Sequence, residues 1–160
     1  MVVKNDSTST GTTGGDVSTT SVVTAKYTSA IKISTSGSSI TLKSNGTTAH
    51  VFPYRGVGNA LYDTPSLQGQ TTDPGIIGMQ NYSMTIPTTP AAATTQEANS
   101  LGPIGMALNG VPIYNDREGG NVPVDAGVLT SMDRAGAHPG QGNTYHYHFT
   151  GDFTEMMMKT

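Results

Sequence analysis

The residues of this chain best suited to chemistry are histidines gathered near its C-terminus. The sequence has four histidines, and three of them (His138, His146 and His148) fall between residues 133 and 148. Tyr145–His148 predicts a short strand, because it is aromatic and follows a Gly-Gln-Gly-Asn turn. Alternate side chains of a strand share a face, so His146 and His148 project to the same side. With His138 brought back by the glycine-rich turn, this is a geometry that binds a metal ion. The alternative is a pair of surface histidines.

Composition limits the class of protein that positions these histidines. A chain of 160 residues fits one domain, and its 34% hydrophobic and 12% charged residues are both below the globular average. It has no cysteine, so a metal must be held by imidazole, carboxylate or backbone oxygen. The net charge of −3 argues against nucleic acid as a partner, and no apolar run is long enough to span a bilayer.

The low charge and the abundance of Thr, Ser, Gly and Asn are typical of secreted and surface β-proteins. We therefore expect an extracellular or cell-surface location, with any signal peptide removed from this sequence. Three N-x-Ser/Thr sequons permit glycosylation in such a compartment, although triplets of this kind also arise by chance in a chain rich in Ser and Thr. Their asparagines are Asn5, Asn45 and Asn81.

The chain divides into three predicted parts: residues 1–21, 22–152 and 153–160. The first is Thr/Ser-rich and has the composition of a segment that does not fold alone. Threonine has good β propensity, so we expect this segment to act as an extended strand for self-association. The alternative is a tail held by its own domain. The apolar residues that would anchor the assembly strand are Val2, Val3, Val22 and Val23. The third part is a methionine-rich tail.

Residues 22–152 predict a mainly β, antiparallel, sandwich-like domain with long Gly/Pro-rich loops and at most one short helix. Alternating apolar residues in 31–34 and 40–43 indicate a hairpin with one buried face. A second tight hairpin is expected around Asn109-Gly110, and 82–87 predicts a further strand. The segment 91–99 is the helical candidate.

Several of these segments, taken in order, resemble the YHYH domain family, which is named for a Tyr-His-Tyr-His motif. The resemblance rests on Tyr145–His148, on Ala137-His138-Pro139, and on the run from Gly102 to Asn115. Upstream, Ser44–His50 is similar to the family's Ser-Asn-Gly-x-Pro-x-His element, with Thr48 where proline is usual, and Gln80–Pro87 is similar to its Gln-x-Tyr-x-x-x-Ile-Pro strand. The resemblance covers about residues 30 to 150. Family members often carry a cysteine before Gly-His-Pro, and this chain has none.

The resemblance adds His50, so that all four histidines fall on motif positions. Four imidazoles, or three with Asp133, would suit one copper or zinc site. Asp133 could instead orient a ligating histidine or cap the glycine-rich turn. Calcium is a further possible cofactor, for which the candidates are the acidic residues of the preceding loop: Asp116, Glu118 and Asp125. Met156, Met157 and Met158 could offer thioethers to Cu(I) or form an apolar end.

Three classes of function remain open. The first is a structural or assembly subunit of an extracellular fibre or surface layer, carrying a histidine metal site. The second is a copper or zinc enzyme or metal-binding protein, which is disfavoured as an enzyme by sparse acid–base residues and the absence of Gly-x-Ser-x-Gly. The third is a carbohydrate-binding module. Its sugar-stacking candidates are Tyr54, Tyr62, Tyr114, Tyr145 and Tyr147.

Overall fold

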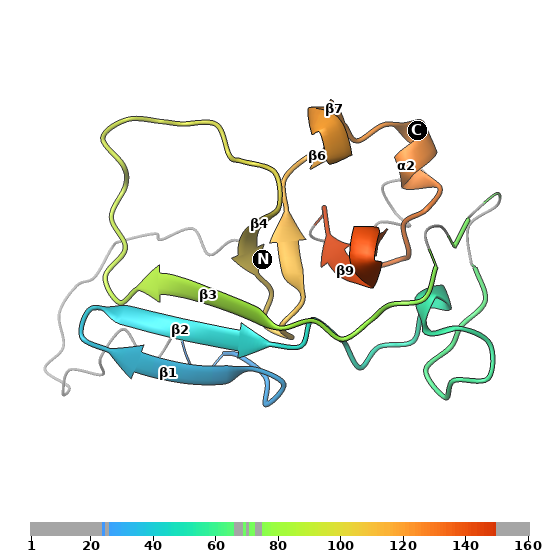
Figure 1. Cartoon of the computed structure of the whole chain (residues 1–160), viewed down its shortest axis with the longest axis horizontal. Coiled ribbons are helices and arrows are strands. Elements are labelled where there is room, and N and C mark those ends of the chain that lie inside the picture. The colour runs from blue at the N-terminus through green and yellow to red at the C-terminus, as the bar shows by residue number, and fades with distance from the viewer. Residues whose placement is uncertain (1–23, 25, 66–68, 70, 73–74, 150–160) are drawn as a thin grey trace, which may run out of the picture.

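The computed structural model describes residues 24, 26–65, 69, 71–72 and 75–149, and the described chain is mainly β (Figure 1). The predicted assembly segment 1–21, which includes Asn5, lies outside these residues, as do Val22, Val23 and the methionine-rich tail. Within the described residues, no helix has the length and apolar character needed to cross a membrane.

The first sheet has the order β1-β2-β3 and is antiparallel throughout. Its strands are β1 (Lys32–Ser36), β2 (Ser39–Ser44) and β3 (Tyr82–Pro87). Ile33 pairs with Leu42 and Thr35 with Ile40, which confirms the first predicted hairpin. Its apolar face packs in a core with Ile31, Ile40, Leu42 and Met106. Period-two alternation therefore set which face of this sheet is buried.

The second sheet has the order β4-β5-β9-β8. Its strands are β4 (Pro103–Met106), β5 (Pro112–Tyr114), β8 (Ala137–Gly140) and β9 (Thr144–Tyr147). The antiparallel pair β4–β5 confirms the second hairpin, and the turn places Gly110 at a φ of 89°, which glycine adopts without strain. β5 and β9 are parallel, and a long crossover connection, which parallel strands require, joins them.

That connection contains the small antiparallel ribbon of β6 (Arg117–Glu118) and β7 (Val122–Pro123). It continues into the single-turn helix α2 (Ala126–Leu129), then into β8. Short 3-10 turns lie at Pro53–Arg55, Gly119–Asn121 and Gln141–Asn143.

The helix expected at residues 91–99 was wrong. The structure has no helix there, and all of these residues are exposed. A short isolated helix is marginal in water, and this segment has no apolar face with which to gain tertiary packing.

A second core lies between the second sheet and the loop that begins at Val51. It consists of Phe52, Tyr54, Val111, Ala137 and Tyr145. The ring centroids of Phe52 and Tyr145 lie 4.7 Å apart, so this core is built largely from aromatic contacts. One face of β9 is therefore anchored in the interior.

Candidate metal centre

Strand β9 and its neighbour β8 bring three histidines to one face of the second sheet. In the antiparallel β8–β9 pair, His138 lies directly opposite His146. Side chains opposite each other share a face, and His148 follows two residues later on the same side. The connecting turn uses Gly142 and Asn143 in left-handed conformations, with φ values of 72° and 61°. The predicted alternation of histidine and tyrosine along the strand is thus observed.

Glu118 joins these histidines from the β6–β7 ribbon. Its Oε1 lies 2.9 Å from His148 Nε2 and 3.2 Å from His138 Nε2. His146 Nε2 lies 2.9 Å from His148 Nε2, and the four ligand atoms are all within 4.8 Å of one another. His138 and His146 are buried, the His148 side chain is 0% exposed and Glu118 is 25% exposed. Glu118 is therefore the side of the cluster nearest to solvent.

Backbone contacts fix the tautomers of two of the histidines. His146 Nδ1 lies 2.9 Å from the carbonyl oxygen of Thr144, and His148 Nδ1 lies 2.6 Å from that of Asn115. A carbonyl oxygen only accepts, so both Nδ1 atoms carry a proton and donate it. In a neutral ring the lone pair is then at Nε2, the atom directed at the cluster.

The same reasoning applies to His138 through a serine. Ser131 Oγ lies 2.7 Å from the carbonyl oxygen of Val128, to which its hydroxyl donates, and 2.7 Å from His138 Nδ1. Serine has a single hydroxyl proton, so its oxygen must accept from His138 Nδ1–H. In its neutral form, each of the three rings therefore presents a lone pair at Nε2.

Two of the ligand atoms at the centre of the cluster lie close together but form no hydrogen bond with each other. His138 Nε2 and Glu118 Oε1 are buried without a hydrogen-bond partner, although they are only 3.2 Å apart. Two acceptors at this separation have no proton between them. One shared proton would satisfy a single pair among the four atoms, whereas a metal ion would accept all four lone pairs.

Burial favours the neutral imidazoles that a metal requires. Desolvation, with the nearby His148 as a smaller cause, lowers the pKa of His138 to about 4. Desolvation also lowers the pKa of His146 to about 3. Both rings are therefore neutral at pH 7, and neutral imidazole is the form that coordinates metals.

A tyrosine covers one histidine of the cluster. The Tyr114 ring stacks on His146 with centroids 4.0 Å apart and meets His148 edge-on at 6.1 Å. Burial raises the pKa of Tyr114, so its phenol is protonated at neutral pH. This stacking and the Nδ1 hydrogen bond hold the ring of His146 in one orientation, as second contacts commonly do for metal ligands.

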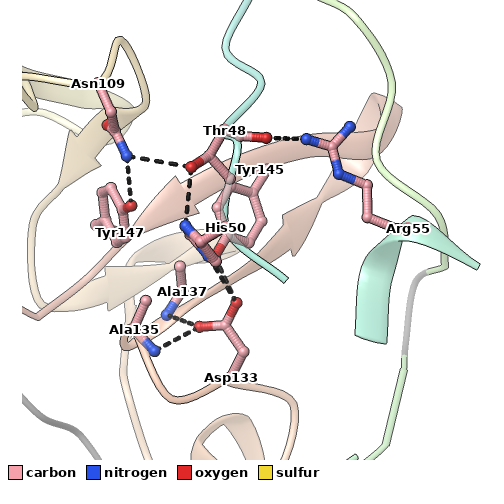
Figure 2. A network of polar contacts seen from close by, with 9 residues as sticks. All are labelled: Thr48, His50, Arg55, Asn109, Asp133, Ala135, Ala137, Tyr145 and Tyr147. Atoms are coloured by element: carbon pink, nitrogen blue, oxygen red, sulfur yellow. Dashed lines mark hydrogen bonds and ion pairs between the residues drawn. The ribbon is translucent and has the colours of Figure 1, made fainter. Parts of the chain in front are cut away.

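His50 and Asp133 do not join this cluster, because they lie on the opposite face of β9 (Figure 2). His50 Nε2 is 3.1 Å from Tyr145 Oη, and its Nδ1 is 2.8 Å from Thr48 Oγ1. Tyr145 donates its hydroxyl proton to Asp133 Oδ2. Both ring nitrogens of His50 are thus engaged away from the other histidines, and one site containing all four histidines is not what the structure builds.

Asp133 has the turn-capping role that the sequence left open. Its Oδ1 accepts hydrogen bonds from the backbone N–H groups of Ala135 at 2.8 Å and Ala137 at 3.3 Å. Asp133 is also 3.8 Å from His50 Nε2 and is itself 3% exposed. A buried carboxylate is stable only when its oxygens are bonded in this way.

The three calcium candidates separate in the structure. Glu118 lies with the histidines, whereas Asp125 accepts from the N–H groups of Gly127 and Val128 and caps α2. Asp116 is exposed, and the described residues contain no acidic group of three that includes it. Of the glycosylation candidates, Asn45 and Asn81 are both exposed.

Comparison with known proteins gives one match. Residues 83–160 match the family described as YHYH protein. Searches of curated proteins and of solved structures returned no match. The matched range contains the whole His/Glu cluster, whereas His50 and the first hairpin precede it. Over residues 83–160, this match confirms the resemblance to the YHYH family.

Proposed function

We propose that this protein binds one divalent transition metal ion through His138, His146, His148 and Glu118, and that the ion stabilises an extracellular structural protein. The observation that supports the metal is the convergence of three Nε2 lone pairs and one carboxylate oxygen in a buried space. Each imidazole is oriented by an oxygen partner at Nδ1, the arrangement that typically supports metal-ligating histidines.

Zinc or copper suits this set of donors. Imidazole nitrogen binds both metals well, carboxylate oxygen completes the set, and the chain has no thiolate to offer. Calcium prefers six to eight oxygen ligands, so a cluster dominated by nitrogen disfavours it.

The positions of the four ligands in the fold support a structural role. Glu118 comes from the β6–β7 ribbon, His138 from β8, and His146 and His148 from β9 and its end. Four protein ligands fill a tetrahedral site, which is the pattern of closed structural zinc centres. Metal binding would fasten the ribbon to the sheet and add its binding free energy to folding.

The test compares metal content between matched variants of the full chain. His146→Ala with His148→Ala should remove stoichiometric zinc or copper in elemental analysis after purification. His50→Ala removes an imidazole outside the cluster and should keep the metal. Retention of the ion by the double variant, or its loss from the His50 variant, would contradict the assignment.

A metal-dependent enzyme is the second candidate. Glu118 is the most exposed member of the cluster, with 25% of its side chain accessible, so a substrate or water could take its place. An enzyme of this kind should keep its fold when metal is removed and should bind a competing small anion at the metal. A chelator that lowers the melting temperature sharply would favour the structural role.

The wider extracellular and assembly role rests on composition. Low charge, the absence of cysteine and the Thr/Ser-rich residues 1–21 support a secreted subunit that associates through its N-terminus. Deleting residues 1–21 should leave a folded monomer in sedimentation and electron microscopy. Assembly of the truncated chain equal to that of the full chain would reject this role.

A further inference from the structure

Apart from Pro87, the outer face of the β1–β2–β3 sheet carries polar side chains, most of them serine and threonine. The register aligns them in rows across the three strands, and two of the rows are Lys32–Lys43–Ser83 and Ser34–Thr41–Thr85. The Oγ1 atoms of Thr41 and Thr85 lie 3.5 Å apart, so hydroxyls of neighbouring strands meet. The opposite face of the same strands carries the apolar core.

At one end of this face, two lysines lie directly opposite each other. Lys32 is the cross-strand partner of Lys43, and both are exposed. Like charges placed opposite each other in an antiparallel pair are destabilising. In the described part of the chain neither lysine forms an ion pair, so no carboxylate offsets that repulsion.

The same two lysines line a surface hollow with neutral polar groups. Its wall contains amide and hydroxyl side chains and no acidic residue; the lining is Ala30, Lys32, Lys43, Ser44, Asn45, Gln80 and Asn81. Part of this wall is held in place, because Gln80 N donates to the carbonyl oxygen of Asn45 at 2.8 Å. The Gln80 side chain donates to the carbonyl oxygens of Gly78 and Gly142. The hollow is thus a positive, hydrogen-bonding concavity on a chain of net charge −3.

We propose that this face binds an acidic polysaccharide, with a sugar carboxylate between Lys32 and Lys43 in the hollow. The amide groups at the rim and the hydroxyl row beyond the lysines would bond the sugar hydroxyls of the continuing chain. Charge complementarity carries the assignment, because an anion removes the repulsion between the two lysines and no residue of the hollow repels it. This inference is independent of the metal, whose ligands lie on the second sheet and the β6–β7 ribbon.

The experiment measures binding of oligogalacturonate to the full, non-glycosylated chain by calorimetry at low salt. Non-glycosylated protein is needed because Asn45 and Asn81 belong to sequons and line the hollow. Changing Lys32→Ser and Lys43→Ser together should weaken binding by about three- to tenfold, since each exposed ion pair contributes little by itself. Lys43→Ser should weaken binding more than Lys26→Ser, which removes the same charge from an exposed position outside the hollow.

Two further measurements separate a sugar site from simple charge attraction. The double lysine variant should melt at or above the temperature of the unchanged protein, because the repulsion is relieved, so weaker binding cannot reflect unfolding. Thr41→Val with Thr85→Val keeps the charge and should weaken oligogalacturonate binding but not binding of polyglutamate. Equal binding of polyglutamate and oligogalacturonate, or equal effects of Lys43→Ser and Lys26→Ser, would overturn the proposal. A sulfated polysaccharide that binds as well as oligogalacturonate would show that the anion, and not the carboxylate itself, is recognised.

Discussion

The two faces of β9 carry networks of similar residue types that differ in how their polar atoms are satisfied. On one face, Tyr145 donates to Asp133 and interacts with His50, which in turn contacts Thr48. On the other, His146 Nε2 and His148 Nε2 lie 2.9 Å apart, and the Nδ1 atom of each ring is bonded to a backbone carbonyl oxygen. On the tyrosine face, which holds Tyr145, the polar atoms form a complete set of hydrogen bonds. On the histidine face, which holds His146 and His148, the buried His138 Nε2 and Glu118 Oε1 have no hydrogen-bond partner.

The tyrosine face can be traced as a chain of donors running in one direction (Figure 2). Asn109 Nδ2 donates to Thr48 Oγ1 at 3.3 Å, and Thr48 then donates to His50 Nδ1 at 2.8 Å. His50 Nε2–H donates to Tyr145, whose proton goes to Asp133. Thr48 and Tyr145 each have one hydroxyl proton and give it once, so this chain of hydrogen bonds is consistent without any ligand. Its role is to fix the turn and the aromatic core.

The difference teaches how histidines in one chain can have opposite roles. Three of the four histidines fall within the residues that match the YHYH family, and His50 precedes them. The orientation of each ring is set by the partner of its Nδ1 atom. In the cluster these partners are acceptors, so a neutral ring there carries its lone pair at Nε2. For His50 the partner can donate, which leaves Nε2 protonated and suited to a hydrogen bond. Such contacts therefore decide which histidine is available to a metal.

Metal removal should give the largest contrast between the two faces. A chelator should lower the melting temperature of the full chain markedly, because structural zinc sites can contribute on the order of 10 kcal/mol to folding. The His146→Ala, His148→Ala variant should show no further change with chelator. Calorimetry with and without chelator measures both. An unchanged melting temperature of the metal-loaded protein would remove the structural role.

Lowering the pH should destabilise the metal-free protein through the histidine face. In the folded protein the pKa of His138 is lowered from 6.5 to about 4 and that of His146 to about 3. At pH values below 6.5 and above these lowered pKa values, the unfolded chain therefore binds more protons than the folded protein does. Their contribution is complete above pH 6.5 and is lost as pH falls through 4, a change on the order of a few kcal/mol.

Urea unfolding of metal-free protein at a series of pH values measures how steeply the unfolding free energy falls with pH. Changing His138 and His146 to Gln should flatten this slope, while His50→Gln is the matched control. A slope between pH 6.5 and 4 that survives the double change would show that other groups are responsible.

Removing the phenol of Tyr145 should damage the tyrosine face alone. Tyr145→Phe leaves the buried Asp133 Oδ2 without its donor, at a cost of about 1–3 kcal/mol of unfolding free energy. Metal content should be unchanged, because Tyr145 points away from the cluster. Chemical denaturation and elemental analysis of the same sample provide the two readouts, and loss of metal would mean that the two faces are coupled.

Glu118→Gln should give the smallest effect. It should stabilise the metal-free protein and weaken metal binding. Without metal, the Gln amide can donate to an imidazole lone pair, which adds about 0.5–1.5 kcal/mol of stability. With metal, the loss of an anionic ligand should weaken binding. Chemical denaturation of the variant with and without metal measures both changes in unfolding free energy. Glu118→Ala is the control, because alanine can neither donate a hydrogen bond from its side chain nor bind the metal. Equal behaviour of the two variants would show that the Glu118 carboxylate does not act in the cluster.

Local pattern was enough to predict much of the β architecture. The alternation in residues 31–43 predicted the first hairpin, and Asn109-Gly110 predicted the turn between β4 and β5. The helix at 91–99 failed because its composition suits a helix while its surroundings offer nothing to pack against. A strand with one buried face was predictable where apolar and polar residues alternate along it.

Glu118 shows why the site was only partly predictable. It was a candidate for calcium together with Asp116 and Asp125, because the three share a loop. Its approach to the histidines depends on the β6–β7 ribbon and on a separation of 20 residues from His138, for which no spacing rule exists. Stacking of Tyr114 on His146 was missed for the same reason.

The sequence by itself determined the chemistry available to this protein and the sidedness of its last strand. Without cysteine, no thiolate ligand is available, and the period of two in Tyr145–His148 separates histidines from tyrosines. The tertiary structure decided which groups meet. The β8–β9 register placed His138 opposite His146, and Thr48 turned His50 toward Tyr145. These outcomes depend on contacts between residues far apart in the chain, and local periodicity carries no information about such contacts.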